Sequence, residues 1–232
     1  LLIMFVTFYT SRMVLEALGI YDFGLYSVVG SIIILFSFIQ NVSALATQRF
    51  LSVGLGRNDH AWTNKVFNTS FLVHLTICAF VLFFAETVGL WFISHKMNIP
   101  SDRVSDVFWV YQLSINSLLF QIMQTPFMAA LIALEKMDTF AKIGVFDAFQ
   151  RWFMVFVFTL FNFNHKMVYY SLFLLVGYFL VFVLYLVFCI NKLDICKIKP
   201  KISESKDLFK EILSFSSWSM IGSCLLYTSP SP

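Results

Sequence analysis

Long apolar runs separated by short polar connections make up most of this chain. A membrane-spanning helix needs about 20 mostly apolar residues. Six such runs lie at residues 1–18, 24–46, 66–94, 107–134, 141–161 and 167–190, and a seventh begins near residue 212. Segments such as 31–39 and 71–84 are apolar on nearly every side, whereas the strands of a membrane barrel alternate with period two. The pattern therefore predicts an all-α, polytopic membrane protein.

The composition narrows the classes of function. Of the 232 residues, 59% are apolar and only 12% are charged, against about 45–50% and about 25% in soluble domains. Too little polar surface is left for a soluble enzyme or a cytosolic binding module. A net charge of +3 without a basic stripe excludes a nucleic-acid partner. Because no cysteine pair or histidine spacing is typical of a metal site, we expect no metal, no cofactor and no enzymatic activity.

The basic residues indicate how the chain is oriented. Most of the 16 lysines and arginines fall in the loops that follow the second, fourth and sixth runs. The positive-inside rule places these loops in the cytoplasm, and the N-terminus lies on the same side. We therefore expect a multi-pass protein with a cytoplasmic N-terminus.

One polar stretch divides the chain. Residues 191–211 are rich in lysine, contain Pro200 and end in an amphipathic pattern, which predicts a basic cytoplasmic linker with an interfacial helix. It separates a six-span bundle, residues 1–190, from the start of a seventh span at 212–223. This is the layout of a two-bundle transporter, although an ordinary long loop has the same composition. Residues 224–232 break the seventh apolar run with two prolines, so we expect a non-native tail and a fragment open at both ends.

Charged residues inside the spans are the first candidates for function, because each is costly in lipid. Asp147 and Arg151 are four residues apart and share one helix face. They either line an aqueous cavity, with Arg151 meeting an anionic substrate, or neutralise each other and lock helices together. Arg12 and Glu16 have the same spacing; they either line the cavity, or Arg12 reaches the outer headgroups.

Further polar positions lie in the third and fourth runs. Glu86 has no charged residue four positions away. It is either a group that couples transport to an ion, a role for which Asp147 is also a candidate, or a hydrogen-bonded packing residue. Gln121 and Gln124 continue a polar stripe that begins at Ser114 and Ser117. The stripe either binds sugar hydroxyls in a cavity or joins neighbouring helices.

Residues 10–26 (TSRMVLEALGIYDFGLY) resemble the first loop of bacterial polysaccharide flippases, with Phe23 where that family often has tyrosine. Residues 46–52, 126–129 with 135–137, and 215–218 are similar to later segments of the same proteins, in the same order. The resemblance is to the O-antigen and polysaccharide flippases of the multidrug/oligosaccharidyl-lipid/polysaccharide exporter superfamily.

The resemblance implies two six-helix bundles around a central cavity that works by alternating access. This chain would supply the N-terminal bundle and the start of the second. The implied function is to flip polyprenyl-pyrophosphate-linked oligosaccharides across the bacterial inner membrane, for capsule, O-antigen or another surface polysaccharide. The implied partners are this lipid-linked oligosaccharide, membrane lipid and a coupling ion, either proton or sodium. By their place in the matched segments, Arg12 and Arg49 would meet the pyrophosphate.

Two other functions remain open. A cation-coupled multidrug antiporter of the same superfamily would face its drug with acidic groups, and Glu86 and Asp147 are available for that role. An integral-membrane enzyme of glycan assembly would need a larger catalytic loop than this chain carries.

Overall fold

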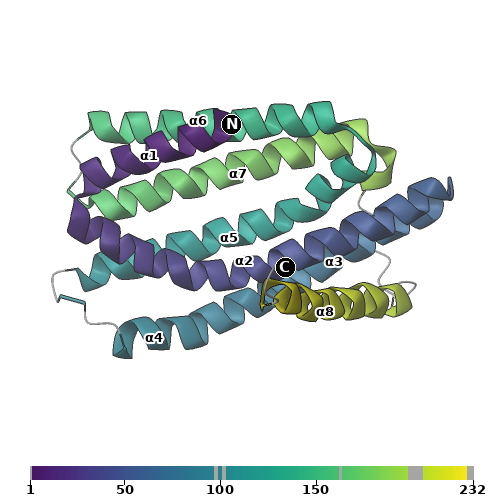
Figure 1. The fold of residues 1–232 in the computed structure, drawn as a ribbon, viewed down its shortest axis with the longest axis horizontal. Helices are drawn as coiled ribbons and strands as arrows, with labels where there is room; N and C mark the ends of the chain where they lie inside the picture. The colour runs from purple at the N-terminus through teal and green to yellow at the C-terminus, as the bar shows by residue number, and fades with distance from the viewer. Residues whose placement is uncertain (1, 97–98, 101–102, 162–163, 198–205, 229–232) are drawn as a thin grey trace. The chain divides into compact units, whose positions relative to one another are not determined.

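The computed structural model describes residues 2–96, 99–100, 103–161, 164–197 and 206–228, and these residues form helices and short connections without any strand (Figure 1). The α-helices are α1 (Leu2–Leu18), α2 (Ile20–Gly56), α3 (His60–Phe84), α4 (Leu90–His95), α5 (Val104–Ala133), α6 (Met137–Leu160), α7 (Lys166–Lys192) and α8 (Lys206–Thr228). A π-helical turn, η1 (Ala85–Gly89), joins α3 to α4, and a 3-10 turn, η2 (Asp194–Cys196), follows α7. The prediction of an all-α chain is confirmed.

Among the described residues, four stretches of helix are long and apolar enough to cross a membrane: His60–His95, Val104–Ala133, Met137–Leu160 and Lys166–Lys192. They coincide with the third to sixth predicted spans. Helices α1 and α2, of 17 and 37 residues, occupy the first two predicted runs. Whether these two cross a membrane, and whether the chain is half of a two-bundle transporter, stay predictions.

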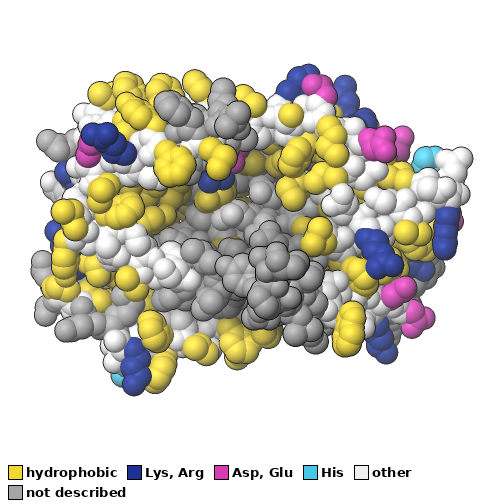
Figure 2. Space-filling model, in the orientation of Figure 1, with side chains coloured by type: hydrophobic (Ala, Val, Ile, Leu, Met, Phe, Trp, Pro, Cys, Tyr) yellow, Lys and Arg dark blue, Asp and Glu magenta, His cyan; other side chains and the backbone are white. Residues whose placement is uncertain are grey.

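Large apolar side chains are exposed along the helices. Phe8, Phe83, Phe149 and Phe161 are each more than half exposed, and hydrophobic side chains are spread over much of the face drawn in Figure 2. Soluble monomers rarely expose apolar surface on this scale. The surface therefore fits a lipid environment better than water, in agreement with the composition.

The helices form two compact units. Unit 1 comprises Leu1–Leu35, Phe80–Gln121 and Ala141–Leu184, and unit 2 comprises Phe36–Ala79, Ile122–Phe140 and Tyr185–Pro232. The boundaries fall inside helices, so each unit contains segments of several long helices.

Unit 1 has a core of aliphatic and aromatic side chains from six α-helices and the π turn η1. Phe158 of α6 contacts Tyr170 of α7, with ring centroids 5.8 Å apart, and Tyr170 meets Tyr26 of α2 at 5.1 Å in an edge-to-face arrangement. Val14 of α1 and Ile115 of α5 are fully buried in the same cluster. These contacts hold α6 and α7 beside α1 and the start of α2.

A single glycine separates the first two helices. Gly19 adopts φ of +84°, a left-handed conformation that L side chains rarely adopt. Helix α1 ends at Leu18 and α2 begins at Ile20, so the segment that resembles the flippase loop is helical on both sides of Gly19. The reversal brings the α1 residues Thr10 and Ser11 and the α2 residues Tyr26 and Ser27 to one cavity.

Unit 2 packs α3 against α5 and α8 against α2. Phe127 makes edge-to-face contacts with Phe67 and Phe71, with centroids 5.5 and 6.0 Å apart, and Phe215 of α8 meets Phe50 of α2 at 6.0 Å. Helix α8 is continuous from Lys206 to Thr228, so the predicted interfacial helix and the start of the predicted seventh span are one helix. Residues 198–205 of the predicted linker and 229–232 of the predicted tail lie outside the described residues.

Two asparagines of α3 form hydrogen bonds with the turn that follows α7. The Asn64 side chain donates to the carbonyl oxygens of Ile195 (2.8 Å) and Lys197 (3.1 Å), and Asn68 donates to Lys197 at 3.2 Å. Amide side chains are good partners for carbonyls left unpaired at a helix end. The start of the predicted linker is thus fixed to the first turns of α3.

The π turn η1 depends on a tyrosine from a neighbouring helix. A π-helical turn frees a carbonyl from the usual helical ladder, and here the Tyr111 hydroxyl donates to the Ala85 carbonyl oxygen at 2.8 Å. Gly89 lies directly beneath this hydroxyl, where a Cβ atom would overlap it. The turn and the tyrosine therefore require glycine at position 89.

We predict that Gly89→Ala destabilises the chain by about 1–3 kcal/mol, because the added methyl must displace Tyr111. Gly30→Ala is the matched control. A Cβ at this position of α2 meets no atom within 4 Å, so alanine should be neutral or stabilising by roughly 0.5–1 kcal/mol. Thermal unfolding of both variants in detergent measures the difference; equal effects would contradict the account.

Candidate functional site

Unit 1 contains a cavity of about 540 Å³ between α1, α2, α6 and α7. This volume lies within the range of about 300–1,000 Å³ found for small-molecule sites. Its lining combines apolar and polar side chains: Thr10, Ser11, Val14, Phe23, Tyr26, Ser27, Gly144, Asp147, Ala148, Arg151, Val155, Tyr170, Leu174 and Tyr178. A cavity with this polar content, two of whose four lining helices (α6 and α7) are long and apolar enough to cross a membrane, is the strongest candidate site in the described part of the chain.

The two charged residues of the cavity are paired with each other. Arg151 Nε donates to Asp147 Oδ1 at 2.9 Å, and Arg151 Nη2 donates to Asp147 Oδ2 at 2.8 Å. The predicted one-turn pairing on α6 is confirmed, and its bidentate geometry is the strong form of this interaction.

Tyr178 of α7 completes this group. Arg151 Nη1 donates to the Tyr178 hydroxyl at 3.2 Å, and the guanidinium carbon lies 4.8 Å from the centre of the Tyr178 ring. Each nitrogen of the guanidinium group therefore has a partner. The pair both lines a cavity and connects α6 to α7, while a contact of Arg151 with an anionic substrate stays a prediction.

Two further tyrosines present hydroxyl groups in the cavity. Among the described residues, the hydroxyls of Tyr26 and Tyr170 have no hydrogen-bond partner. Ser27, which lies beside Tyr26 in the chain, donates to the Phe23 carbonyl oxygen at 2.8 Å and keeps its acceptor lone pairs. The cavity thus offers hydroxyl groups and aromatic surface beside a neutralised charge pair.

Gln150 is a site residue that the sequence did not reveal. Its side chain is only 7% exposed, and neither amide atom has a hydrogen-bond partner among the described residues. It lines a small pocket together with Asp147, Arg151 and Tyr178. Its amide group lies so close to Gly177 that a Cβ atom at position 177 would overlap it. The one available signal was its position directly before Arg151 inside a span. A lone glutamine in a helix belongs to no motif.

The other charged pair lies outside this cavity. Arg12 Nε donates to Glu16 Oε1 at 3.0 Å, as the spacing predicts, but the two side chains are 79% and 66% exposed. Neither lines the cavity of Asp147 and Arg151.

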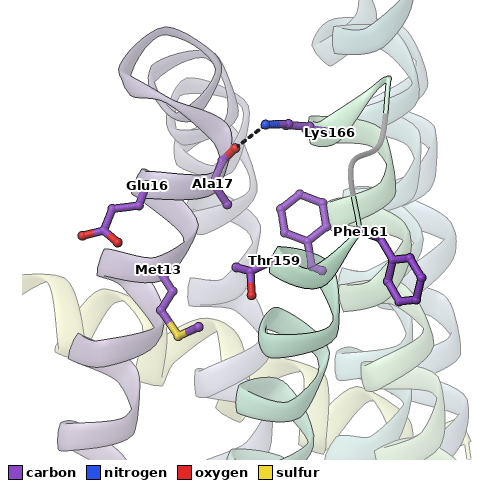
Figure 3. Close-up of a pocket in the computed structure, with 7 residues that line it drawn as sticks. Met13, Glu16, Ala17, Thr159, Phe161 and Lys166 are labelled. Atoms are coloured by element: carbon purple, nitrogen blue, oxygen red, sulfur yellow. Dashed lines mark hydrogen bonds between the residues drawn. The ribbon is translucent and has the colours of Figure 1, made fainter.

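Glu16 instead borders a second pocket of unit 1, of about 320 Å³, together with Met13, Ala17, Thr159 and Lys166 (Figure 3). Lys166 Nζ donates to the Ala17 carbonyl oxygen at 3.1 Å, and the Glu16 carboxylate points away from Lys166 (Figure 3). The lysine therefore satisfies the end of α1, where a cation is favourable, and leaves the glutamate unpaired with it.

Glu86 lies on the π turn η1. It is half-buried and accepts a hydrogen bond from Gln112 Nε2 at 3.2 Å. No group of three or more histidine, cysteine, aspartate or glutamate residues in the described ranges is arranged to hold a metal ion. The coupling role of Glu86 stays a prediction, since its surroundings fit a hydrogen-bonded packing group equally well.

The polar stripe of α5 is mostly satisfied within its own helix. Ser117 donates to the Leu113 carbonyl oxygen at 2.9 Å, and Gln121 Nε2 donates to the Ser117 carbonyl oxygen at 3.4 Å. Gln124 Oε1 is buried without a hydrogen-bond partner among the described residues. Neither glutamine lines the cavity of unit 1.

Arg49 belongs to unit 2, where its guanidinium carbon lies 4.5 Å from the centre of the Phe215 ring. Its role toward a pyrophosphate stays a prediction. Of the residues proposed from the sequence, the structure therefore brings only Asp147 and Arg151 together in the cavity.

Two cysteines lie together at the end of α7. A hydrogen bond with Cys189 raises the pKa of the Cys196 thiol well above its usual range, and burial raises it further. Nearby, the hydrogen bond from Lys197 Nζ, 2.7 Å from Asp194 Oδ1, lowers the pKa of that exposed carboxyl. Because the thiolate is the reactive form of cysteine, this direction of the shift disfavours Cys196 as a nucleophile.

No protein-family model, curated protein or solved structure matches this chain.

We predict that Gln150→Met raises the unfolding free energy by about 1–2 kcal/mol, because it replaces a buried amide without partners by an apolar side chain of similar shape. Gln112→Met is the contrast. It removes the donor that Glu86 accepts from, so it should lower stability. Thermal unfolding in detergent separates the two. A loss of stability at position 150 matching that at position 112 would show that the Gln150 amide has a partner.

Proposed function

We propose that the chain is part of a membrane transporter that flips lipid-linked oligosaccharide precursors across the bacterial inner membrane, for capsule, O-antigen or other surface polysaccharide synthesis. The observation that supports this most is the polar cavity of unit 1, which is lined in part by the membrane-length helices α6 and α7 and contains the Asp147–Arg151 pair. Charged groups inside a membrane are costly, and they commonly mark a substrate pathway.

The connections support a transporter over a membrane enzyme of glycan assembly. Helix α2 follows α1 after Gly19 alone, and only three residues separate α2 from α3 and α5 from α6. Connections this short leave no room for a catalytic domain. Together with the motifs of residues 10–26, they fit a helix bundle whose function lies between its helices.

The proposal includes a cytoplasmic N-terminus, alternating access between two bundles and contact of the pyrophosphate with Arg12 and Arg49. Arg12 is exposed, and only its Nε donates a hydrogen bond to Glu16. Arg49 is exposed and stacks on an aromatic ring. Both guanidinium groups retain donors for an anion. Arg151, by contrast, already uses three of its five N–H groups for Asp147 and Tyr178.

A second candidate function is a cation-coupled multidrug antiporter. The observation that favours it is the aromatic lining of the cavity, since tyrosine rings such as those of Tyr26 and Tyr170 can attract an organic cation. In that case Asp147 must leave Arg151 to meet the drug, and Glu86 or Asp147 would take the coupling proton. Drug/proton exchange in proteoliposomes, without movement of lipid-linked sugar, would favour this function over the flippase.

We predict that Arg151→Ala in the gene for this protein abolishes surface glycan display while the protein still inserts. The change leaves the Asp147 carboxylate without its partner beside the cavity. Surface glycan is measured by antibody or lectin staining, and insertion by membrane fractionation. Arg57→Ala, at an exposed position after α2, is the control and should leave display unchanged. Normal display in the Arg151 variant would show that the pair is only structural and would count against the proposal.

A further inference from the structure

We infer that the cavity of unit 1 binds an uncharged sugar ring, so that it receives the glycan of the proposed substrate and not the pyrophosphate. The inference rests on the proposed function for the identity of the complete substrate. The glycan is assigned to this cavity because of the charge and the chemical groups of the residues that line it.

The lining carries no net charge. Asp147 and Arg151 are its only charged residues in the described part of the chain, and they neutralise each other through two hydrogen bonds. The remaining guanidinium nitrogen donates to Tyr178. Phosphate is recognised through free N–H donors of arginine or lysine. Three of the five N–H groups of Arg151 are already engaged, and a phosphate at the remaining two would approach the Asp147 carboxylate that the same guanidinium group holds, so like-charge repulsion disfavours it.

The same pairing disfavours a cationic ligand. An organic cation in a site shielded from water needs an unpaired carboxylate or several aromatic faces to replace its hydration. Asp147 is held by Arg151, and the Tyr178 ring already faces the guanidinium group. The cavity therefore favours a ligand that brings hydrogen-bonding groups without a charge.

The hydroxyls and rings of the tyrosines supply those complementary groups. The Tyr26 and Tyr170 hydroxyls have no partner among the described residues, so both can donate to and accept from a ligand hydroxyl. Their rings meet edge to face at 5.1 Å, so each also offers apolar surface. A pyranose ring presents both kinds of surface, with hydroxyls around its edge and C–H bonds on its faces.

The rest of the lining also combines polar and apolar side chains. Val14, Phe23, Val155 and Leu174 are apolar, whereas Thr10, Ser11 and Ser27 carry hydroxyls. Together they form a neutral site that is polar without being ionic, and its volume of about 540 Å³ is typical of a site for a small organic molecule.

The test is a binding panel on the purified 232-residue chain in lipid nanodiscs. The probes are the methyl glycosides of glucose, galactose, mannose and N-acetylglucosamine, together with inorganic pyrophosphate and tetraphenylphosphonium. Binding is measured by isothermal titration calorimetry. We expect at least one glycoside to bind, and we expect Tyr170→Phe and Tyr26→Phe each to weaken it about tenfold, because each removes one hydrogen-bonding group. Tyr21→Phe changes an exposed tyrosine of α2 outside the cavity and should leave affinity unchanged.

The other outcomes separate this inference from the proposed function. Binding of no glycoside, or glycoside binding that responds equally to Tyr21→Phe and Tyr170→Phe, overturns the inference. So does pyrophosphate binding that is lost in Arg151→Ala, and this result leaves the flippase proposal intact. Tetraphenylphosphonium binding without glycoside binding overturns the inference and favours the antiporter. Glycoside binding with normal surface glycan in Arg151→Ala would support the sugar site and contradict the proposed function.

Discussion

A charged pair inside an apolar helix must be neutralised, and the arrangement of unit 1 depends on that constraint. Asp147 and Arg151 lie one turn apart on α6, and two hydrogen bonds join them. This pairing leaves the guanidinium group with one further nitrogen, which reaches Tyr178 on α7. The pair therefore links two helices and gives the cavity a polar but uncharged wall. Without this neutralisation, a cavity at this position would cost several kcal/mol for each unpaired ion.

Small residues and tyrosines hold the helices around this wall. Gly19 reverses the chain so that α1 and α2 both reach the cavity. Gly177 allows the Gln150 side chain to lie against α7, and Tyr170 joins α7 to α2 through Tyr26. The buried amide of Gln150 is costly for stability, and uncompensated costs of this kind concentrate at functional sites. Buried polar groups next to the cavity thus lower the stability of the fold.

The helices and the main ion pair could be predicted from the sequence, because both depend on local spacing. Apolar runs of membrane length give α3 to α7, and a four-residue separation gives the Asp147–Arg151 pair. The partners across helices could not be predicted, because contacts of Tyr26, Tyr170 and Tyr178 depend on how helices pack. The same applies to the π turn, where a distant tyrosine satisfies the Ala85 carbonyl. The sequence also suggested a cavity role for Arg12, whereas Arg12 lies outside the cavity that Asp147 and Arg151 line.

The most direct test of the central claim is a double-mutant cycle on the charged pair. The free energies of unfolding of Asp147→Ala, Arg151→Ala and the double variant are measured in detergent. If neutralisation is the governing constraint, each single change leaves an unpaired ion, and the double variant should be more stable than the additive sum by about 1–3 kcal/mol. The pair is partly exposed in the cavity, which places the coupling below that of a fully buried pair. Additive effects of the two substitutions would contradict the account.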